Sequence, residues 1–151
     1  MNRYTFILAA FAFLAACHTA PSIKPAPALS GNYVLDPAHA SITWSLSHAG
    51  LSNYTARFDD ISGTLSFDSS NPENSQVDIR IDPASVSTGL ADFDETITTD
   101  SRYFNAAAFP EIRFKSTAAL ALTENTGTLT GNLTFRGQTH PVTLDVIYNG
   151  A

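Results

Sequence analysis

The chain has 151 residues, 44% of them hydrophobic, with 14 acidic against 8 basic side chains. This length and composition predict one folded domain with a sizeable core and exclude an intrinsically disordered chain. The formal net charge of −6 and the lack of any run of Lys or Arg exclude the basic surface that nucleic acids bind, so we expect no nucleic-acid partner.

The N-terminal segment has the pattern of a bacterial lipoprotein signal. Arg3 precedes an apolar run, Phe6 to Ala16, that is too short to cross a bilayer, which takes ~20 residues. The string LAAC, which ends at the sole cysteine, Cys17, resembles a lipobox. We expect residues 1–16 to be a cleaved signal peptide and Cys17 to be lipidated. The alternative is an ordinary signal peptide with a cysteine near its cleavage site.

The residue after Cys17 is His18 rather than the aspartate that resembles an inner-membrane retention signal. The expected location is therefore the periplasm, with a lipid anchor in the outer membrane. Residues 17–31 contain three prolines and little that could pack, so they should form an extended tether of up to ~40 Å. Residues 32–151 remain as the folded domain.

From Tyr33 onward, apolar and polar residues alternate with the period of half-buried β-strands. Turn-forming loops at 68–72 and 124–127 favour antiparallel hairpins, so the predicted class is all-β. The residues expected to face the core are, strand by strand, Ile42, Trp44 and Leu46; Ile61, Gly63, Leu65 and Phe67; Val77, Ile79 and Ile81; Ile112 and Phe114; Leu129, Leu133 and Phe135; and Val142, Leu144, Val146 and Tyr148.

Such a sheet can pack on a second sheet or close as a barrel, and the alternation favours neither. Gly63 and Gly131 lie on the apolar face, where they permit either a barrel kink or a gap that a neighbouring aromatic fills. The segment 91–110 breaks the alternation. Asp92 and Glu95 have capping-box spacing, which predicts a short helix around 92–105. The segment either covers one end of the β-structure as a lid or plug, or is a loop anchored by its own aromatic residues.

Residue patterns for catalysis are missing from the sequence. There is no G-x-S-x-G motif and no phosphate-binding glycine loop, and His39 and His48 lack the spacing of a zinc pair. We expect no catalytic residue, no metal and no cofactor. His48 sits on the apolar side of its strand, where it could orient a ligand or bond to a backbone group near the strand end. His140 precedes Pro141 at an expected turn.

Short motifs follow one another in a specific order from Tyr33 to the end of the chain. They are YVLDPAH at 33–39, HAG at 48–50, GTLSFD at 63–68, SVST at 85–88, YFN at 103–105, FPEIRFKS at 109–116 and GNLTFRG at 131–137. Together they resemble the YceI-like family of periplasmic, lipocalin-like proteins. The resemblance implies an antiparallel eight-stranded barrel that holds a long polyisoprenoid lipid in its apolar interior, for storage or transport and without catalysis.

The resemblance also implies a ligand pocket formed by the inward-facing side chains. The expected pocket residues are Trp44, Leu46, His48, Phe58, Leu65, Phe67, Val77, Ile79, Ile81, Phe114, Leu133, Phe135 and Leu144.

The chain departs from the family pattern in two places. Family members usually carry basic residues after the SVST strand, whereas residues 90–99 read LADFDETITT, so we expect a quinone-like ligand rather than a prenyl diphosphate. The family pattern also continues for a few dozen residues beyond Ala151, so the closing strands of the barrel are expected to be missing. A homodimer is a further possibility.

Two other functions remain open. A structural or adhesive β-domain would have a filled core and no cavity. A lipid-modifying hydrolase or isomerase would use His48 or His39 as a base, with an acid or nucleophile within hydrogen-bond reach.

Overall fold

The structure is a computed structural model that describes residues 27–149. The expected signal peptide, Cys17 and most of the tether lie outside the described residues. The described elements are β1 Gly31–Val34, β2 Ile42–His48, β3 Ser52–Phe58, β4 Ile61–Phe67, η1 Pro72–Asn74, β5 Gln76–Ile81, η2 Pro83–Ser85, β6 Val86–Ser87, α2 Ala91–Thr99, β7 Ile112–Ala121, β8 Thr126–Phe135 and β9 Gln138–Ile147.

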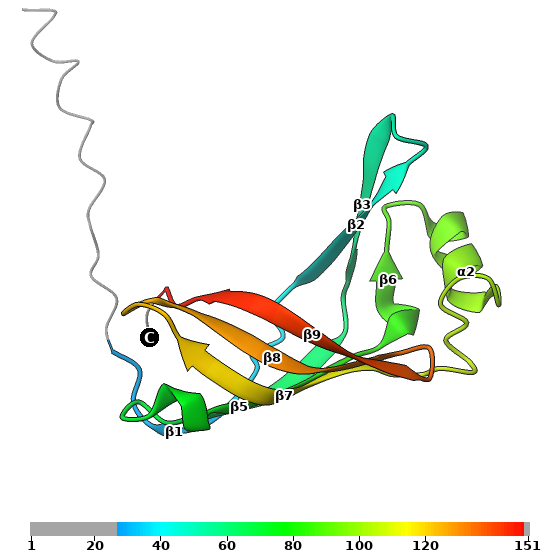
Figure 1. The fold of residues 1–151 in the computed structure, drawn as a ribbon. Helices are drawn as coiled ribbons and strands as arrows, with labels where there is room; N and C mark the ends of the chain where they lie inside the picture. The colour runs from blue at the N-terminus through cyan, green and yellow to red at the C-terminus, as the bar shows by residue number, and fades with distance from the viewer. Residues whose placement is uncertain (1–26, 150–151) are drawn as a thin grey trace, which may run out of the picture.

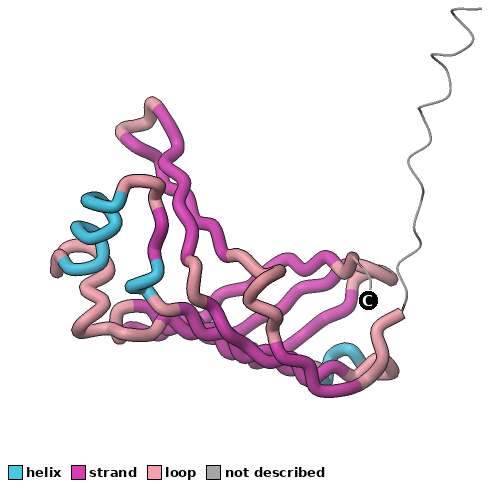
Figure 2. Tube along the Cα trace, turned by 180° about the vertical axis from the view of Figure 1, so that it is seen from behind, coloured by secondary structure: helices cyan, strands magenta, loops and turns pink. Residues whose placement is uncertain are grey.

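The strands form two antiparallel sheets, which confirms the all-β prediction. One has the order β1-β4-β5-β7-β8-β9 and the other the order β2-β3-β6. In Figure 1 the six-stranded sheet lies along the base and the β2–β3 hairpin rises from it, with β6 and α2 beside the hairpin. Figure 2 shows from behind that the tip of the hairpin and the far end of the long sheet point away from each other.

The two sheets meet at one corner, where two strand pairs bend together. The chain passes from β3 to β4 at Asp59 and Asp60, and from β5 to β6 at Asp82 to Ser85. Asp59 N–H donates to the Ser85 carbonyl at 3.0 Å, and Asp82 N–H donates to the Asp60 carbonyl at 3.0 Å. These bonds join the two bends, so the sheets form a single curled surface with a concave interior.

The hydrophobic core lies at this corner. Its buried members are Phe58, Ile61, Ile81, Val86, Ile97 and Ile112. Ile97 comes from α2, so the helix is held against the sheets by its apolar side. Full burial of side chains of this size contributes ~1.5–3 kcal/mol each.

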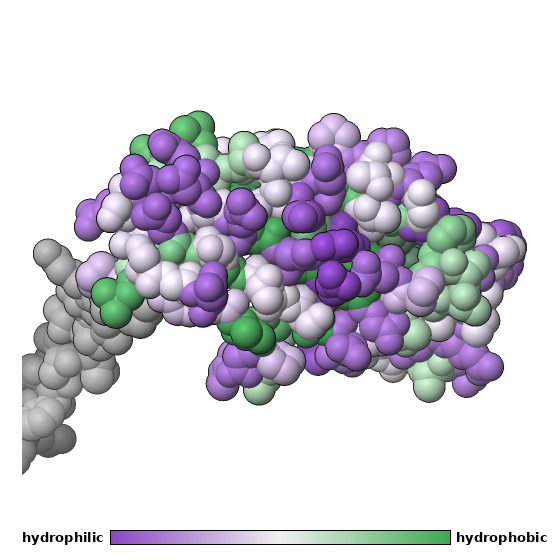
Figure 3. Space-filling view, turned by 90° about the horizontal axis from the view of Figure 1, so that it is seen from below, coloured by the Kyte–Doolittle hydropathy of each residue, from purple (hydrophilic) through white to green (hydrophobic). Residues whose placement is uncertain are grey.

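The outer face of the long sheet is polar and held by ion pairs. Arg80 lies directly opposite Arg113 across the β5–β7 ladder, an unfavourable pairing of like charges. Asp78 accepts from Arg113 Nε at 2.8 Å, and Glu111 accepts from Arg80 at 3.0 Å, so each guanidinium has a carboxylate partner. In Figure 3, which views the molecule from below, strongly hydrophilic side chains gather along the middle of this face.

The predicted helix forms, but its capping differs from the prediction. The N-cap is Leu90, which offers no side-chain cap, and Asp92 and Glu95 form no capping box. Asp94 instead accepts from the Thr88 backbone N–H at 2.7 Å. Among residues 27–149, no helix is long and apolar enough to cross a lipid bilayer.

The turn expected at His140 and Pro141 was placed wrongly. Both residues lie inside β9, and the β8–β9 turn is formed by Arg136 and Gly137, whose φ angles are 48° and 73°. Pro141 is tolerated because, in the described part of the chain, β9 is an edge strand. Gly131 leaves a gap that a neighbouring aromatic fills, as one of the two alternatives predicted. The Phe114 ring occupies the space beside it, 2.5 Å from where a Cβ would lie.

Candidate functional site

An apolar cavity of about 470 Å³ opens on the concave side of the long sheet. The register explains its wall: Leu65 pairs with Tyr33 on one side and with Val77 on the other, so their side chains share a face. None of the lining residues is charged. They are Ala28, Tyr33, Val34, Leu35, Gly63, Thr64, Leu65, Phe67, Val77, Ile79 and Tyr148.

The cavity lies where the two ends of the described chain meet. Ala28 precedes β1 and Tyr148 follows β9, yet both line the same space. The Tyr148 N–H donates to the Asn125 carbonyl at 2.8 Å, which fixes the end of β9 beside the β7–β8 turn. Figure 1 shows both chain ends at this side of the molecule, away from α2.

At the α2 side, the interior is filled by an aromatic cluster. Its members are Trp44, Tyr54, Phe58, Phe93, Phe104 and Phe135, whose neighbouring ring centroids lie 5.4–6.4 Å apart. Ile79 lines the cavity and also packs against the buried core that Trp44 and Phe104 contact. The apolar interior is therefore continuous from the cavity to the aromatic cluster.

Two polar atoms inside the aromatic cluster have no partner. Trp44 Nε1 and Tyr54 OH are buried and make no hydrogen bond, and they are the two buried side-chain polar atoms in residues 27–149 of which this is true. Their rings lie 6.4 Å apart. Trp44 pairs with Ala56 and Leu46 with Tyr54, so the two rings are diagonal neighbours on the inner face of β2–β3.

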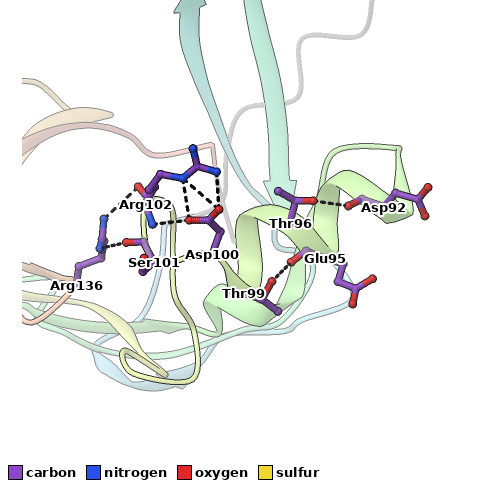
Figure 4. Close-up of polar contacts among 8 residues, drawn as sticks. All are labelled: Asp92, Glu95, Thr96, Thr99, Asp100, Ser101, Arg102 and Arg136. Carbon is purple, nitrogen blue, oxygen red and sulfur yellow. Dashed lines mark hydrogen bonds and ion pairs between the residues drawn. The ribbon is translucent and has the colours of Figure 1, made fainter.

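Residues 91–110, here named the cover segment, supply Phe93 and Phe104 to the cluster. Arg136, in the β8–β9 turn, fastens this segment (Figure 4). Its Nη2 donates to the Ser101 carbonyl at 2.6 Å, and its guanidinium lies 5.7 Å from the centre of the Phe109 ring. Within the segment, hydrogen bonds from Arg102 lower the pKa of Asp100 to about 2.

The structure distributes the expected pocket residues over three environments. Leu65, Phe67, Val77 and Ile79 line the cavity. Phe58, Ile81 and Phe114 are buried, and Trp44 and Leu133 pack against the core. Leu46, Phe135 and Leu144 are 50%, 39% and 44% exposed, although Phe135 still contacts Phe104.

The histidines lie outside the interior. His48 is exposed at the tip of the β2–β3 hairpin, where its carbonyl accepts from the Leu51 N–H at 3.0 Å. His39 Nδ1 lies 2.8 Å from an exposed Asp36 carboxylate and lowers the pKa of that group. Within residues 27–149 no group of three or more His, Cys, Asp or Glu side chains could hold a metal ion.

Sequence reasoning overlooked several residues of the interior, three of which left a signal in the sequence. Tyr33 and Leu35 line the cavity, and their spacing of two in YVLDPAH was a usable signal. Tyr54 was missed because β3 was not recognised, although Tyr54, Ala56 and Phe58 alternate as a half-buried strand should.

Two antiparallel sheets, joined at one corner into a surface that curls around an apolar cavity and is covered by a short helix at one end, define a lipocalin-like β-protein. The model of the YceI-like domain matches residues 33–151, and the chain belongs to this family. The family assignment and the lipocalin-like barrel class are thereby confirmed.

Three comparisons illustrate the relationship. A UPF0312 protein of Pseudomonas savastanoi is 35% identical over 125 residues, which are 82% of this chain and 65% of that protein. The crystal structure of Burkholderia cenocepacia BcnA is similar at a TM-score of 0.69, with 25% identity, over 77% of this chain and 73% of the other. The crystal structure of the Campylobacter jejuni YceI protein gives 0.59, with 29% identity, over 75% and 66% of the two chains. The chain thus spans about two thirds of the length of these relatives.

Proposed function

We propose that this protein binds a long-chain polyisoprenoid lipid in its apolar interior, for storage or transport in the periplasm and without catalytic turnover. The observation that carries the proposal is the cavity of about 470 Å³, whose lining includes no charged side chain. Small-molecule sites typically have volumes of ~300–1,000 Å³ and mostly apolar walls. A flexible hydrocarbon chain suits such a wall, and packed apolar side chains continue from the cavity wall to the aromatic cluster.

The charges near the cluster favour an uncharged head group. Helix α2 carries Asp92, Asp94 and Glu95 and no basic residue. On α2 a diphosphate would find no cationic partner and would be repelled by these carboxylates, and the nearby Arg102 and Arg136 already bond to Asp100 and to the Ser101 carbonyl. The proposed ligand is therefore quinone-like rather than a prenyl diphosphate.

Competition between a long-chain quinone and a prenyl diphosphate tests this preference. Trp44 is the sole tryptophan and belongs to the aromatic cluster, so quenching of its fluorescence reports binding. We expect the quinone to displace the diphosphate. Tighter binding of the diphosphate would overturn the head-group argument, and binding of neither would favour a structural β-domain.

The alternatives make different demands on the interior. A structural or adhesive domain needs a filled core, which the cavity argues against. A hydrolase or isomerase that uses His48 or His39 as a base needs the imidazole beside bound lipid, whereas both side chains are exposed outside the cavity.

We also propose that Cys17 is lipidated and holds the domain at the outer membrane. The support is the sequence LAAC after an apolar run of signal-peptide length, followed by His18. A radioactive fatty acid should label the protein and should fail to label Cys17→Ser. Equal labelling of the variant would end this part of the proposal.

A further inference from the structure

The two unpartnered polar atoms, Trp44 Nε1 and Tyr54 OH, occur together. A buried donor without an acceptor costs ~1–3 kcal/mol, and most buried polar groups in proteins avoid this cost. Here the two exceptions among the described side chains belong to diagonal neighbours on one face of one hairpin. Their coincidence at the end of the apolar interior points to a missing acceptor.

The surroundings of these donors are aromatic. Phe104 meets Trp44 edge-on at 5.8 Å between ring centroids, and Phe93 meets Tyr54 edge-on at 5.7 Å. Both phenylalanines belong to the cover segment, so this segment packs directly on the rings that carry the two donors. An acceptor that bound here would replace ring contacts with hydrogen bonds.

The donor chemistry limits the acceptor. An indole N–H only donates, and a phenol hydroxyl can donate as well as accept. Helix α2 carries three carboxylates and no basic residue, and the nearby Arg102 and Arg136 already bond to Asp100 and to the Ser101 carbonyl. An anion therefore gains no free cationic partner there, whereas an uncharged carbonyl oxygen has two lone pairs with which to accept from both donors. A pure hydrocarbon would leave both donors unpaired.

We infer that Trp44 and Tyr54 form the head-group site, in which the indole N–H and the phenol O–H donate to an uncharged carbonyl oxygen of the bound lipid. This inference rests on the proposed function and deepens it. The head group lies at the aromatic cluster beneath the cover segment, and the isoprenoid chain extends past Ile79 into the cavity lined by Leu65 and Val77. The two donors then select a carbonyl-bearing isoprenoid over a hydrocarbon of equal length.

Nuclear magnetic resonance of the indole N–H tests the contact directly, because a chain with one tryptophan gives one indole resonance. The probes are a long-chain isoprenoid quinone and squalene, an isoprenoid hydrocarbon without oxygen. We expect the quinone to move the indole proton downfield, as a new hydrogen bond does, and squalene to leave it near its free position. An indole proton that already lies downfield and does not respond to the quinone would mean that water satisfies it, and would overturn the inference.

Affinity gives a second, independent readout. Tyr54→Phe removes one donor and keeps the ring, so we expect quinone affinity to fall about tenfold and squalene affinity to stay unchanged. Tyr103→Phe is the matched control, because Tyr103 is 42% exposed and lies outside the aromatic cluster. It should alter neither affinity.

The outcomes separate this inference from the proposed function. Equal affinity of the wild-type protein for quinone and squalene, with Tyr54→Phe without effect, overturns the head-group site and leaves the lipid carrier standing. Binding of neither probe overturns both. If Tyr54→Phe fails to fold, the indole resonance of the wild-type protein decides the question.

Discussion

Phe104 meets Trp44 edge-on, with ring centroids 5.8 Å apart and an interplanar angle of 86°. Phe104 also contacts Phe58 and Phe135, so one residue of the cover segment joins β2, β3 and β8. We expect Phe104→Ala to lower the free energy of unfolding by ~2–4 kcal/mol through the lost contacts and the cavity left behind. Urea denaturation followed by far-ultraviolet circular dichroism measures the loss.

The matched control is Tyr103→Ala. Tyr103 is the adjacent aromatic, but it is 42% exposed and its recorded ring contact is with Arg102. Its removal should cost less than ~0.5 kcal/mol. Equal costs for the two substitutions would mean that the cover segment does not pack on the sheets through Phe104.

Arg136 ties the β8–β9 turn to the cover segment through the carbonyls of Ser101 and Arg102, at 2.6 and 3.4 Å. Arg136→Ala should release these carbonyls, so amide hydrogens in residues 100–110 should exchange faster while those of β4 and β5 keep their rates. Hydrogen exchange read by mass spectrometry resolves the two regions.

Arg102→Ala provides the comparison, since the Arg102 side chain bonds to Asp100 inside the cover segment and does not reach the β8–β9 turn. Exchange in 100–110 should change less than in Arg136→Ala. If Arg136→Ala leaves the exchange of this segment unaltered, the fastening has no effect on its stability.

Arg113 lowers the pKa of Asp78 chiefly through their hydrogen bonds. A carboxylate with a lowered pKa stabilises the fold at pH values above its ordinary pKa of 3.8, and this contribution is lost as the pH falls through the lowered value. Asp78→Asn should therefore cost ~0.5–1 kcal/mol at pH 7 and nothing once the wild-type carboxyl is protonated.

Urea denaturation at pH 7 and at stepwise lower pH measures this difference. Asp145→Asn is the control, because Asp145 is exposed on the edge strand β9 and faces Thr128 across the ladder. A cost for Asp78→Asn that persists unchanged at low pH would contradict an electrostatic origin.

Gly131 leaves no room for a side chain. A Cβ there would lie 2.5 Å from the Lys115 carbonyl oxygen and 2.5 Å from the Phe114 ring. Since a strand carbonyl cannot move aside freely, Gly131→Ala should lower stability by ~1–3 kcal/mol. Gly31→Ala is the control, because its Cβ would meet only the Tyr33 ring at 3.7 Å, and thermal unfolding of the two variants should differ clearly.

The alternation of apolar and polar residues predicted the strands well wherever one face of the strand is packed and the other is exposed to solvent. Strands β4 and β5 were placed within a residue of their observed bounds, since Ile61, Leu65, Val77 and Ile79 follow the period of two without a break. Strand β7 was recognised only in its first half. A bulge between Ser116 and Ala118 shifts its register, and the alternation of side chains shifts with it.

The alternation of apolar and polar residues could not predict the tertiary arrangement of the site. Periodicity says which face of a strand is apolar, but it does not say where the concave surface is filled and where it is hollow. Phe58 and Ile81 belong to the core because the corner between the sheets and Ile97 of α2 close over that part of the interior. Phe114 is buried elsewhere, with its ring over Gly131. His48 was expected on the apolar face, yet it is exposed at the hairpin tip, where it forms the last pair of the β2–β3 ladder with Ser52.

The lipid content of the protein tests the central claim most directly. Mass spectrometry of organic extracts, from protein purified gently out of its native periplasm, should detect an isoprenoid with an uncharged head group. In Leu65→Trp the larger side chain occupies the cavity, so the lipid should be lost while the fold melts near the wild-type temperature. Ile61→Phe, in the filled core, should instead lower stability by ~1–3 kcal/mol. Extracts without lipid, or equal lipid in the wild type and Leu65→Trp, would contradict a lipid carrier that uses this cavity.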